Sequence, residues 1–233
     1  MKGILYLIPL PLGDNQLTES IPSGVIEITG RLRHFIVEEI RTARRYLRKT
    51  DREFPLDESV FHILNEHTRK EELAPMLDSA LRGNDIGLMS EAGLPGIADP
   101  GALIVGMAHR KGITVKPLTG PSSILLALIS SGLNGQNFCF HGYLPVKPSE
   151  REKKIREIET RSKTGEAQIF METPYRNMKM VNDLLRICMK STRLCIASAI
   201  TTDAESIVTL TIAEWKSRVP EINKIPAVFV LQA

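Results

Sequence analysis

A loop unusually rich in glycine and proline is the first candidate for chemistry in this chain. It covers Ser90–Gly101, reads SEAGLPGIADPG, and holds three glycines and two prolines among twelve residues. Glycines allow backbone amides and carbonyls to approach a ligand closely, and prolines hold that backbone in place. The loop follows a predicted strand, and ligands of open α/β sheets bind beyond the carboxyl ends of the strands. It therefore either recognises a ligand with main-chain groups or serves as a rigid connector.

Two more loops join the end of a predicted strand to the start of a helix. The first, residues 119–123, carries Ser122 and Ser123, whose hydroxyls either cap the helix or bind a polar ligand. The second, residues 170–176, carries Glu172 and, four positions later, an arginine. The carboxylate and the guanidinium either form an ion pair or face a ligand cleft.

A predicted helix over Glu38–Lys49 carries a cluster of arginines. Positions spaced i, i+3, i+4 and i+7 lie on one face of a helix, and here that face holds Arg41, Arg44, Arg45 and Arg48. The face either contacts the phosphates of a nucleic acid, which would make binding depend strongly on salt, or is simply solvated.

These features belong to a chain of ordinary globular composition. Its 233 residues are 42% hydrophobic and 24% charged, with a net charge of +3, which is too small to indicate a nucleic-acid-binding protein by itself. The three cysteines and five histidines show no spacing typical of metal sites, so we expect no metal. No signal peptide and no apolar stretch near 20 residues is visible, so we expect a cytoplasmic protein with no membrane segment.

Several common enzyme motifs are missing from the sequence. GxGxxG and GxxxxGK[ST] do not occur, which argues against the standard dinucleotide and P-loop nucleotide sites. GxSxG is also absent, so the nucleophile turn of the α/β-hydrolases is not indicated.

Strands and helices alternate along the chain, which predicts βαβ units and an α/β fold with a mainly parallel sheet in the N-terminal half. There we predict strands over Gly3–Leu10, Val25–Thr29, Phe35–Val37, Val60–Leu64, Ile86–Ser90 and Ile113–Pro117. A loop over Pro11–Asn15 follows the first strand, and helices cover Glu38–Lys49, Lys70–Arg82 and Ala102–Lys111.

The C-terminal half is predicted to form a second α/β domain with a mixed sheet. Its strands are predicted over Ala167–Glu172, Leu194–Ala199, Ser206–Thr211 and Ala227–Leu231. Its helices are predicted over Ile124–Ser131, Ser149–Lys163, Tyr175–Met189 and Ile212–Val219. The length suits two domains of about 110 residues each, and we place them at residues 1–117 and 118–233.

Taken together, the loops resemble those of the tetrapyrrole methylase superfamily, whose members use S-adenosylmethionine (SAM). The sequence is most similar to the bacterial branch that methylates a ribose 2′-hydroxyl of small-subunit ribosomal RNA. SEAGLPGIADPG matches that branch's SDAGTPGISDPG at most positions. The matching segments follow the same order along nearly the whole chain and are Leu5–Asp14, Glu38–Arg41, Asn65–Glu66, Ser90–Gly101, Thr119–Ser123 and Phe170–Arg176.

The resemblance implies two α/β domains, with substrate on the N-terminal domain and SAM in the cleft between the domains. Carried over by position, the cofactor would contact Ser90, Glu91, Ala92, Gly93, Pro95, Ile97, Ser122 and Ser123. The C-terminal domain would close over it with Met171, Ala199 and Pro226. The resemblance also implies ribosomal RNA or the small ribosomal subunit as partner, and a homodimer to which the apolar helix Ile124–Ser131 could contribute.

Methyl transfer from a sulfonium mainly requires that acceptor, methyl and sulfur be aligned and water excluded. A ribose hydroxyl is a weak acid, so a nearby base helps as its proton leaves. Glu38 and Glu172 are the candidates for that base, and Arg41 completes the candidate catalytic set. Alternatively, each carboxylate is structural and pairs with Arg41 or Arg176.

Departures from the branch leave other functions open. Glu91 stands where the branch has aspartate, Leu94 where it has threonine, and Ile40 replaces a threonine in the basic helix. A tetrapyrrole or another small molecule could be the acceptor within the same fold. A protein that binds SAM without catalysis is a further alternative.

Overall fold

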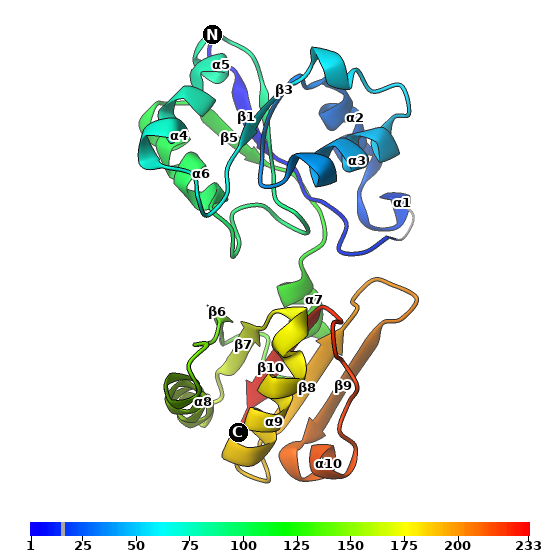
Figure 1. The fold of residues 1–233 in the computed structure, drawn as a ribbon, viewed down its shortest axis with the longest axis vertical. Coiled ribbons are helices and arrows are strands. Elements are labelled where there is room, and N and C mark those ends of the chain that lie inside the picture. The colour runs from blue at the N-terminus through cyan, green and yellow to red at the C-terminus, as the bar shows by residue number, and fades with distance from the viewer. Residues whose placement is uncertain (15–16) are drawn as a thin grey trace. The chain divides into compact units, whose positions relative to one another are not determined.

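The computed structural model describes residues 1–14 and 17–233, so Asn15, the last residue of the predicted loop Pro11–Asn15, lies outside it. The chain folds into two compact units, Met1–Ser122 and Ser123–Ala233 (Figure 1). Each unit contains one five-stranded sheet with helices packed on it. The α/β fold class expected from the sequence is confirmed.

The sheet of the N-terminal unit is parallel throughout, with the strand order β3-β2-β4-β1-β5. Its strands are β1 (Ile4–Leu7), β2 (His34–Val37), β3 (Val60–Ile63), β4 (Ile86–Met89) and β5 (Thr114–Pro117). β4 is central and all four of its residues are buried, as in parallel strands that are covered on both faces. Because the strands are parallel, the loops that follow all five leave the same edge of the sheet.

Helices cover both faces of this sheet (Figure 1). They are α1 (Leu17–Ser20), α2 (Ser23–Arg31), α3 (Ile40–Thr50), α4 (Lys70–Met76), α5 (Asp78–Leu81) and α6 (Gly101–Arg110), with a 3-10 turn at Leu56–Glu58. Ile86 of the sheet and Ile104 of α6 belong to one apolar core, which also includes α4 and α5. Phe35 of the sheet and Leu47 of α3 belong to a second core, which includes α2.

The strand predicted over Val25–Thr29 is wrong, because this segment is the helix α2. Its β-branched residues favour an extended chain by propensity. However, Val25 and Thr29 are the buried residues of α2 and are four positions apart, which is a helical spacing. The Thr29 hydroxyl donates to the Val25 carbonyl at 2.7 Å. Packing of this face therefore outweighs the local preference.

The helix predicted over Lys70–Arg82 is interrupted at Leu77, between α4 and α5. Pro75 lies inside α4, and proline lacks the amide hydrogen that continues the helical hydrogen-bond pattern. The chain resumes helical geometry in α5, so the segment still covers one side of the sheet.

The sheet of the C-terminal unit has the order β6-β7-β10-β8-β9. β6 runs parallel to β7, whereas the other neighbouring pairs are antiparallel, so the predicted mixed sheet is confirmed. Its strands are β6 (Phe138–Tyr143), β7 (Ala167–Met171), β8 (Arg193–Ser198), β9 (Ser206–Thr211) and β10 (Ala227–Gln232). The sequence analysis predicts no strand at β6, because Gly142 interrupts its pattern. In the structure Gly142 has φ +65° and lies next to a shift in register with β7.

The helices of this unit are α7 (Ser123–Ser130), α8 (Pro148–Ser162), α9 (Asn177–Ile187) and α10 (Ile212–Ser217), and a 3-10 turn at Pro174–Arg176 precedes α9. They pack on a core that includes Ile155, Phe170 and Trp215. In the part of the chain that the structure describes, no helix combines the length and the apolar character needed to cross a membrane.

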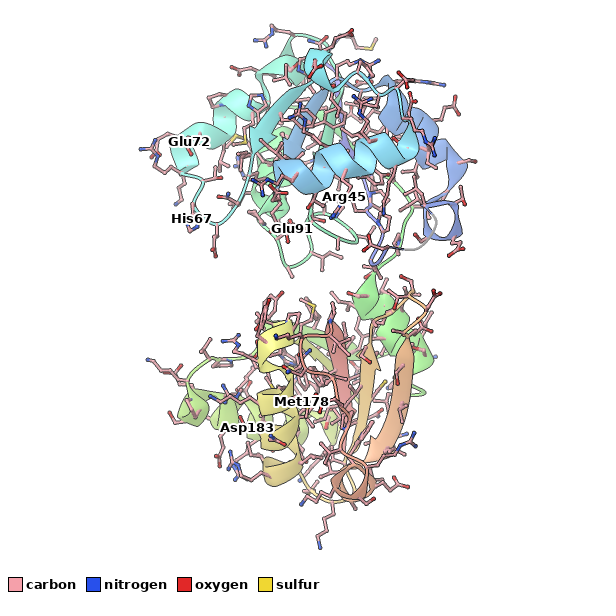
Figure 2. All side chains as sticks on the ribbon, turned by 45° about the vertical axis from the view of Figure 1, so that its right-hand side comes forward. Arg45, His67, Glu72, Glu91, Met178 and Asp183 are labelled. Carbon is pink, nitrogen blue, oxygen red and sulfur yellow. The ribbon has the colours of Figure 1, made fainter. Side chains whose placement is uncertain are left out.

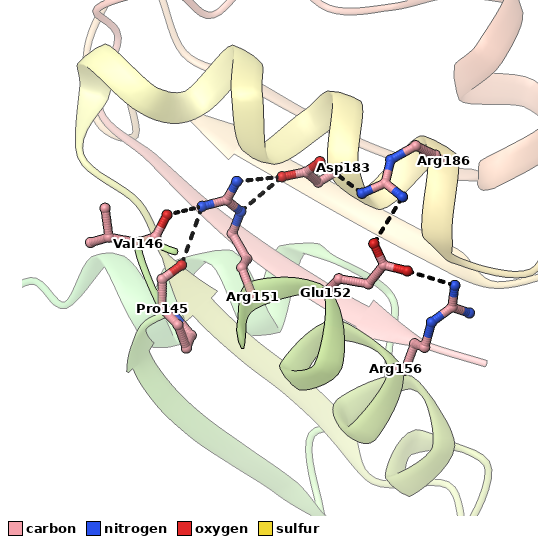
Figure 3. A network of polar contacts seen from close by, with 7 residues as sticks. All are labelled: Pro145, Val146, Arg151, Glu152, Arg156, Asp183 and Arg186. Atoms are coloured by element: carbon pink, nitrogen blue, oxygen red, sulfur yellow. Dashed lines mark hydrogen bonds and ion pairs between the residues drawn. The ribbon is translucent and has the colours of Figure 1, made fainter. Parts of the chain in front are cut away.

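A buried arginine joins three segments of the C-terminal unit (Figure 3). Arg151 on α8 is 2% exposed, and its Nε donates to Oδ2 of Asp183 on α9 at 2.8 Å. Its Nη2 lies 2.6 Å from the same oxygen. Its Nη1 donates to the carbonyl oxygens of Pro145, at 3.2 Å, and Val146, at 2.6 Å. The guanidinium therefore fixes the segment that enters α8 against α9.

Replacing this arginine by methionine should lower the free energy of unfolding by about 3 kcal/mol, the lower part of the range for breaking a buried ion pair. The lower part is expected because Asp183 keeps a second partner, Arg186, at 3.2 Å. Urea unfolding followed by fluorescence measures the change, since Trp215 is the single tryptophan and is buried in the same unit.

Arg156→Met is the matched control for Arg151→Met. Arg156 lies on the same helix, its side chain is 60% exposed, and it pairs with Glu152 at 2.9 Å. Exposed pairs of this kind contribute about 0–1 kcal/mol. Equal stability of the two variants would contradict a structural role for the buried guanidinium.

Candidate functional site

The loops after β1 and β4 are joined by a pair of backbone hydrogen bonds in the N-terminal unit. The Leu10 amide donates to the Gly93 carbonyl at 2.9 Å, and the Gly93 amide donates to the Leu10 carbonyl at 3.0 Å. Gly93 therefore uses both of its main-chain polar groups within the protein. This pair of bonds fixes the conformation of the loop at Gly93.

Two glycines allow the loop after β5 to contact the loops after β1 and β4. Gly93 has φ +69°, and a Cβ added to it would lie 3.2 Å from Cδ2 of Leu12 and 3.5 Å from the carbonyl oxygen of Pro121. A Cβ added to Gly120 would lie 2.2 Å from Cβ of Pro9. The loops after β1, β4 and β5 thus touch one another, and the absence of side chains at these two positions permits the contact.

The rest of the loop after β4 is closed by Asp99, a residue that the sequence analysis did not single out. Its Oδ1 accepts hydrogen bonds from the amides of Gly96, at 2.9 Å, and Gly101, at 2.7 Å. Aspartate side chains commonly bind backbone amides of their own turn, and this habit is the signal that could have identified it. At the start of the loop, the Ser90 hydroxyl donates to the Ala92 carbonyl at 3.1 Å.

Glu38 lies beside this loop, directly after β2. Its amide donates to the Met89 carbonyl at 3.2 Å, and its Oε2 accepts a hydrogen bond from the Glu91 amide at 3.2 Å. A small pocket has Glu38, Ser90 and Asp99 among its lining residues. In the described residues no ion pair joins Glu38 to an arginine, and its carboxylate is bonded instead to the loop after β4 through the Glu91 amide.

Burial shifts the two acids of this pocket in the same direction. The pKa of Glu38 is raised, chiefly by burial; the amide hydrogen bond from Glu91 opposes the shift, and the charges of Glu91 and Asp99 add to it. The pKa of Asp99 is also raised by burial, against the hydrogen bonds from Gly101 and Gly96. The pocket therefore disfavours negative charge and holds acids that gain protons more readily than exposed carboxylates.

The arginine face of α3 is exposed, as its helical spacing predicts, at Arg41, Arg44, Arg45 and Arg48. Figure 2 labels Arg45 on α3 and Glu91 on the loop after β4, both near the lower edge of the N-terminal unit. Arg44 lies 3.7 Å from Asp57. Over residues 1–14 and 17–233, neither Arg41 nor Arg45 takes part in an ion pair, so their charges face solvent.

Three further candidates, Met171, Ala199 and Pro226, gather at one edge of the second sheet. Met171 ends β7 and pairs with Val228, near the start of β10. The Ala199 amide donates to the Pro226 carbonyl at 2.9 Å. Ala199 has φ +49°, a conformation that is costly for a residue with a side chain and that clusters at functional sites.

Glu172 is held by its neighbours in the C-terminal unit. It is 5% exposed, and its Oε1 accepts hydrogen bonds from the Arg176 guanidinium, with Nε at 2.9 Å, and from the Thr173 amide at 2.7 Å. This carboxylate therefore fixes the 3-10 turn after β7.

The candidate cofactor residues thus form two groups, one in each unit. The group in the N-terminal unit combines buried and exposed positions, and its members are Ser90, Glu91, Ala92, Gly93, Pro95, Ile97 and Ser122. The group in the C-terminal unit consists of Ser123, which begins α7, and of Met171, Ala199 and Pro226. Within the described residues, no three histidine, cysteine, aspartate or glutamate side chains are arranged to hold a metal ion.

Several curated bacterial proteins are similar to this chain along most of its length, and those compared share the name ribosomal RNA small subunit methyltransferase I. The protein of Vibrio cholerae is 31% identical over 91% of this chain and 69% of its own length. That of Xylella fastidiosa is 31% identical over 93% and 76%, respectively. That of Haemophilus influenzae is 28% identical over 100% and 79%.

Solved structures with low sequence identity share the fold. Diphthine synthase superposes with a TM-score of 0.67 at 15% identity, covering 99% of this chain and 90% of its own. The methyltransferase CobJ superposes with a TM-score of 0.64 at 18% identity, covering 100% and 94%.

The model of one protein family, described as tetrapyrrole (corrin/porphyrin) methylases, matches residues 5–216. This match includes the three loops of the N-terminal unit and all but one of the strands of the C-terminal sheet. It confirms the resemblance drawn from the loop sequences. The chain therefore belongs to the tetrapyrrole methylase family and is a methyltransferase.

Proposed function

We propose that this chain transfers a methyl group from SAM to a ribose 2′-hydroxyl of small-subunit ribosomal RNA. The observation that carries the proposal is the similarity, along most of the chain, to relatives named ribosomal RNA small subunit methyltransferase I. In this proposal the N-terminal unit supplies the acceptor side, and the C-terminal unit supplies further contacts to the cofactor.

The residues at the strand ends suit SAM. Gly93 and Gly120 lack the side chains that would push apart the loops after β1, β4 and β5. Ala98 and Ala199 have positive φ values of 61° and 49°, and backbone strain of this kind accompanies ligand sites. SAM supplies a methyl group on a sulfonium with a neutral leaving group. The chain then has to bind, orient and shield the reactants.

Glu38 is the residue we assign as the base for the ribose hydroxyl. Glu38 lines the pocket beside the loop after β4, and its raised pKa makes it a better proton acceptor once ionised. Glu172 is already bonded to Arg176 and to the Thr173 amide. We therefore assign it to positioning the turn that follows Met171.

Methylation of small ribosomal subunits taken from a strain without this protein tests the proposal. The purified protein is supplied with SAM carrying a labelled methyl group, and the labelled nucleotide is mapped. Label on a ribose 2′-oxygen supports the proposal. Label on a base, or only on a porphyrinoid, overturns the assigned acceptor. Calorimetric SAM binding without transfer to subunits, free RNA or porphyrinoids indicates a non-catalytic binder, and no binding overturns the cofactor.

The exposed arginines of α3 give this proposal a test on the RNA side. We expect the double variant Arg41→Ala, Arg45→Ala to bind RNA more weakly and to lower the slope of log K against log salt by up to about 1 for each phosphate that the protein no longer neutralises. SAM affinity should not change. Filter binding across a salt series and calorimetry measure the two quantities.

Arg156→Ala serves as the control, because it removes an exposed arginine from α8 in the other unit. An unchanged salt slope in the α3 double variant would remove this helix from the RNA-binding surface.

We also propose a cytoplasmic homodimer. Leu125 and Ile129, one turn apart on the apolar helix α7, are 46% and 75% exposed, and neighbouring exposed apolar side chains of this kind mark association surfaces. Sedimentation equilibrium measures the oligomeric state, and Ile129→Glu should shift it towards monomer. A monomeric wild-type protein would overturn this part of the proposal.

A further inference from the structure

Asn177, the first residue of α9, is fully buried. Its Nδ2 donates a hydrogen bond to the Ile225 carbonyl oxygen at 2.5 Å. Its Oδ1 is also buried and has no hydrogen-bond partner in the residues described. The orientation of the amide follows from this contact, since a carbonyl oxygen can only accept and the side-chain nitrogen must face it.

The Ile225 carbonyl belongs to the short segment Lys224–Pro226 that leads into β10. Three backbone hydrogen bonds also hold this segment, one of them from the Ile225 amide to the nearby Ile222 carbonyl at 3.3 Å. The Lys224 amide donates to the Pro174 carbonyl at 3.0 Å, and the Ala199 amide donates to the Pro226 carbonyl at 2.9 Å. Lys224 has φ +62°, so the segment is kept in a conformation that residues with side chains rarely adopt.

These contacts connect Asn177 to two of the candidate cofactor residues, Pro226 and Ala199. Pro226 follows Ile225 directly, and its carbonyl is bonded to Ala199. The side chain of Asn177 is the only side chain that the described hydrogen bonds attach to this segment, because the other three contacts are between backbone groups. A change at Asn177 therefore acts on the segment without removing any atom from Ala199 or Pro226.

We propose that Asn177 is a positioning residue, which holds the Ile225–Pro226 peptide in the position from which Pro226 contacts SAM. This inference rests on the cofactor assigned under the proposed function. An unsatisfied buried acceptor costs free energy, and an aliphatic side chain of the same size would avoid that cost. The amide is useful here because its other end fixes the segment.

The test compares Asn177→Leu with a matched control, Asn134→Leu. Asn134 also donates its Nδ2 to a backbone carbonyl, that of Gly165, at 2.6 Å. Gly165 precedes β7, so this contact lies at the opposite end of the same sheet from Ile225. Both variants lose a hydrogen bond from a side-chain amide to a backbone carbonyl in the same unit, but only Asn177→Leu loses it beside Pro226. Asn134→Leu is the harsher change of the two, because Asn134 Oδ1 also accepts hydrogen bonds from the amides of Gln136, at 2.9 Å, and Asn137, at 3.3 Å.

We expect Asn177→Leu to raise the SAM Kd about tenfold in calorimetry and to leave kcat at saturating SAM within about twofold. Amide hydrogen exchange at Ala199 and Lys224 should accelerate in the same variant without ligand. Asn134→Leu should change neither the Kd nor these two exchange rates. A tenfold change in Kd corresponds to about 1.4 kcal/mol of binding free energy.

Three outcomes would overturn the inference. The first is an unchanged SAM Kd in folded Asn177→Leu. The second is an equal rise in Asn134→Leu, which would indicate general destabilisation. The third is faster exchange at Ala199 without weaker binding, which would make the contact structural only. If Asn177→Leu does not fold, Asn177→Asp keeps the shape and replaces the donor, and the same results are expected. Failure of the wild-type protein to bind SAM would instead count against the proposed function.

Discussion

Glu38→Gln should lower kcat about 10²- to 10⁴-fold, the range typical of removing a general base. Glutamine keeps the size of the side chain and can still accept the Glu91 amide hydrogen bond that Oε2 accepts at 3.2 Å. It cannot take a proton from the acceptor hydroxyl. Single-turnover methylation of small ribosomal subunits measures the rate, and calorimetry shows whether SAM affinity is retained.

The pH dependence of this reaction should carry the signature of the same group. The base works only when ionised, so the rate should rise with pH and level off above the pKa of Glu38. Because burial raises that pKa, the rise should lie at a higher pH than for an ordinary glutamate. The Glu38→Gln variant should lose this step. Glu172→Gln is the control, and the same loss of the step there would contradict the choice between the two carboxylates.

Gly93→Val should weaken SAM binding by about 10- to 100-fold. A residue with a side chain at φ +69° is strained by about 1–3 kcal/mol, and the new Cβ would press on Leu12 and Pro121. We expect the strain to be relieved by a shift of the loop away from the β1 and β5 loops, and each 1.4 kcal/mol corresponds to a factor of ten in Kd. Calorimetry with SAM measures the loss.

Gly142→Val separates this local effect from backbone strain in general. Gly142 also has a positive φ, of 65°, but a Cβ added there meets no atom within 4 Å and the residue lies in β6. We expect it to cost stability and to leave SAM affinity unchanged. Normal affinity in a folded Gly93→Val variant would reject our account of the loop.

The sequence predicts those parts of the fold that depend on local pattern. β4 is a continuous apolar segment between turn residues, and its position and burial follow from that pattern. The strand predicted over Val25–Thr29 is wrong because β-branched residues carry a local preference that core packing overrides. β6 was missed because Gly142 interrupts its alternation and its pairing with β7 is decided by residues far along the chain.

In the candidate site too, local pattern predicts some features, whereas others depend on tertiary contacts. The composition of Ser90–Gly101 identifies a loop that could bind a ligand. It does not show that Gly93 bonds to Leu10, because hydrogen bonding between residues 83 positions apart depends on the tertiary fold. Nor does spacing show that Glu38 lines a pocket while Glu172 is bonded to Arg176. Those contacts depend on how neighbouring strand ends meet.

The reciprocal pair of hydrogen bonds between Leu10 and Gly93 has a dynamic consequence. Each of the two loops donates one backbone hydrogen bond to the other. We therefore expect the segments after β1 and β4 to move together when a molecule enters or leaves. Their amide protons should then exchange with solvent at matching rates, and a deletion that shortens either segment should disturb the other.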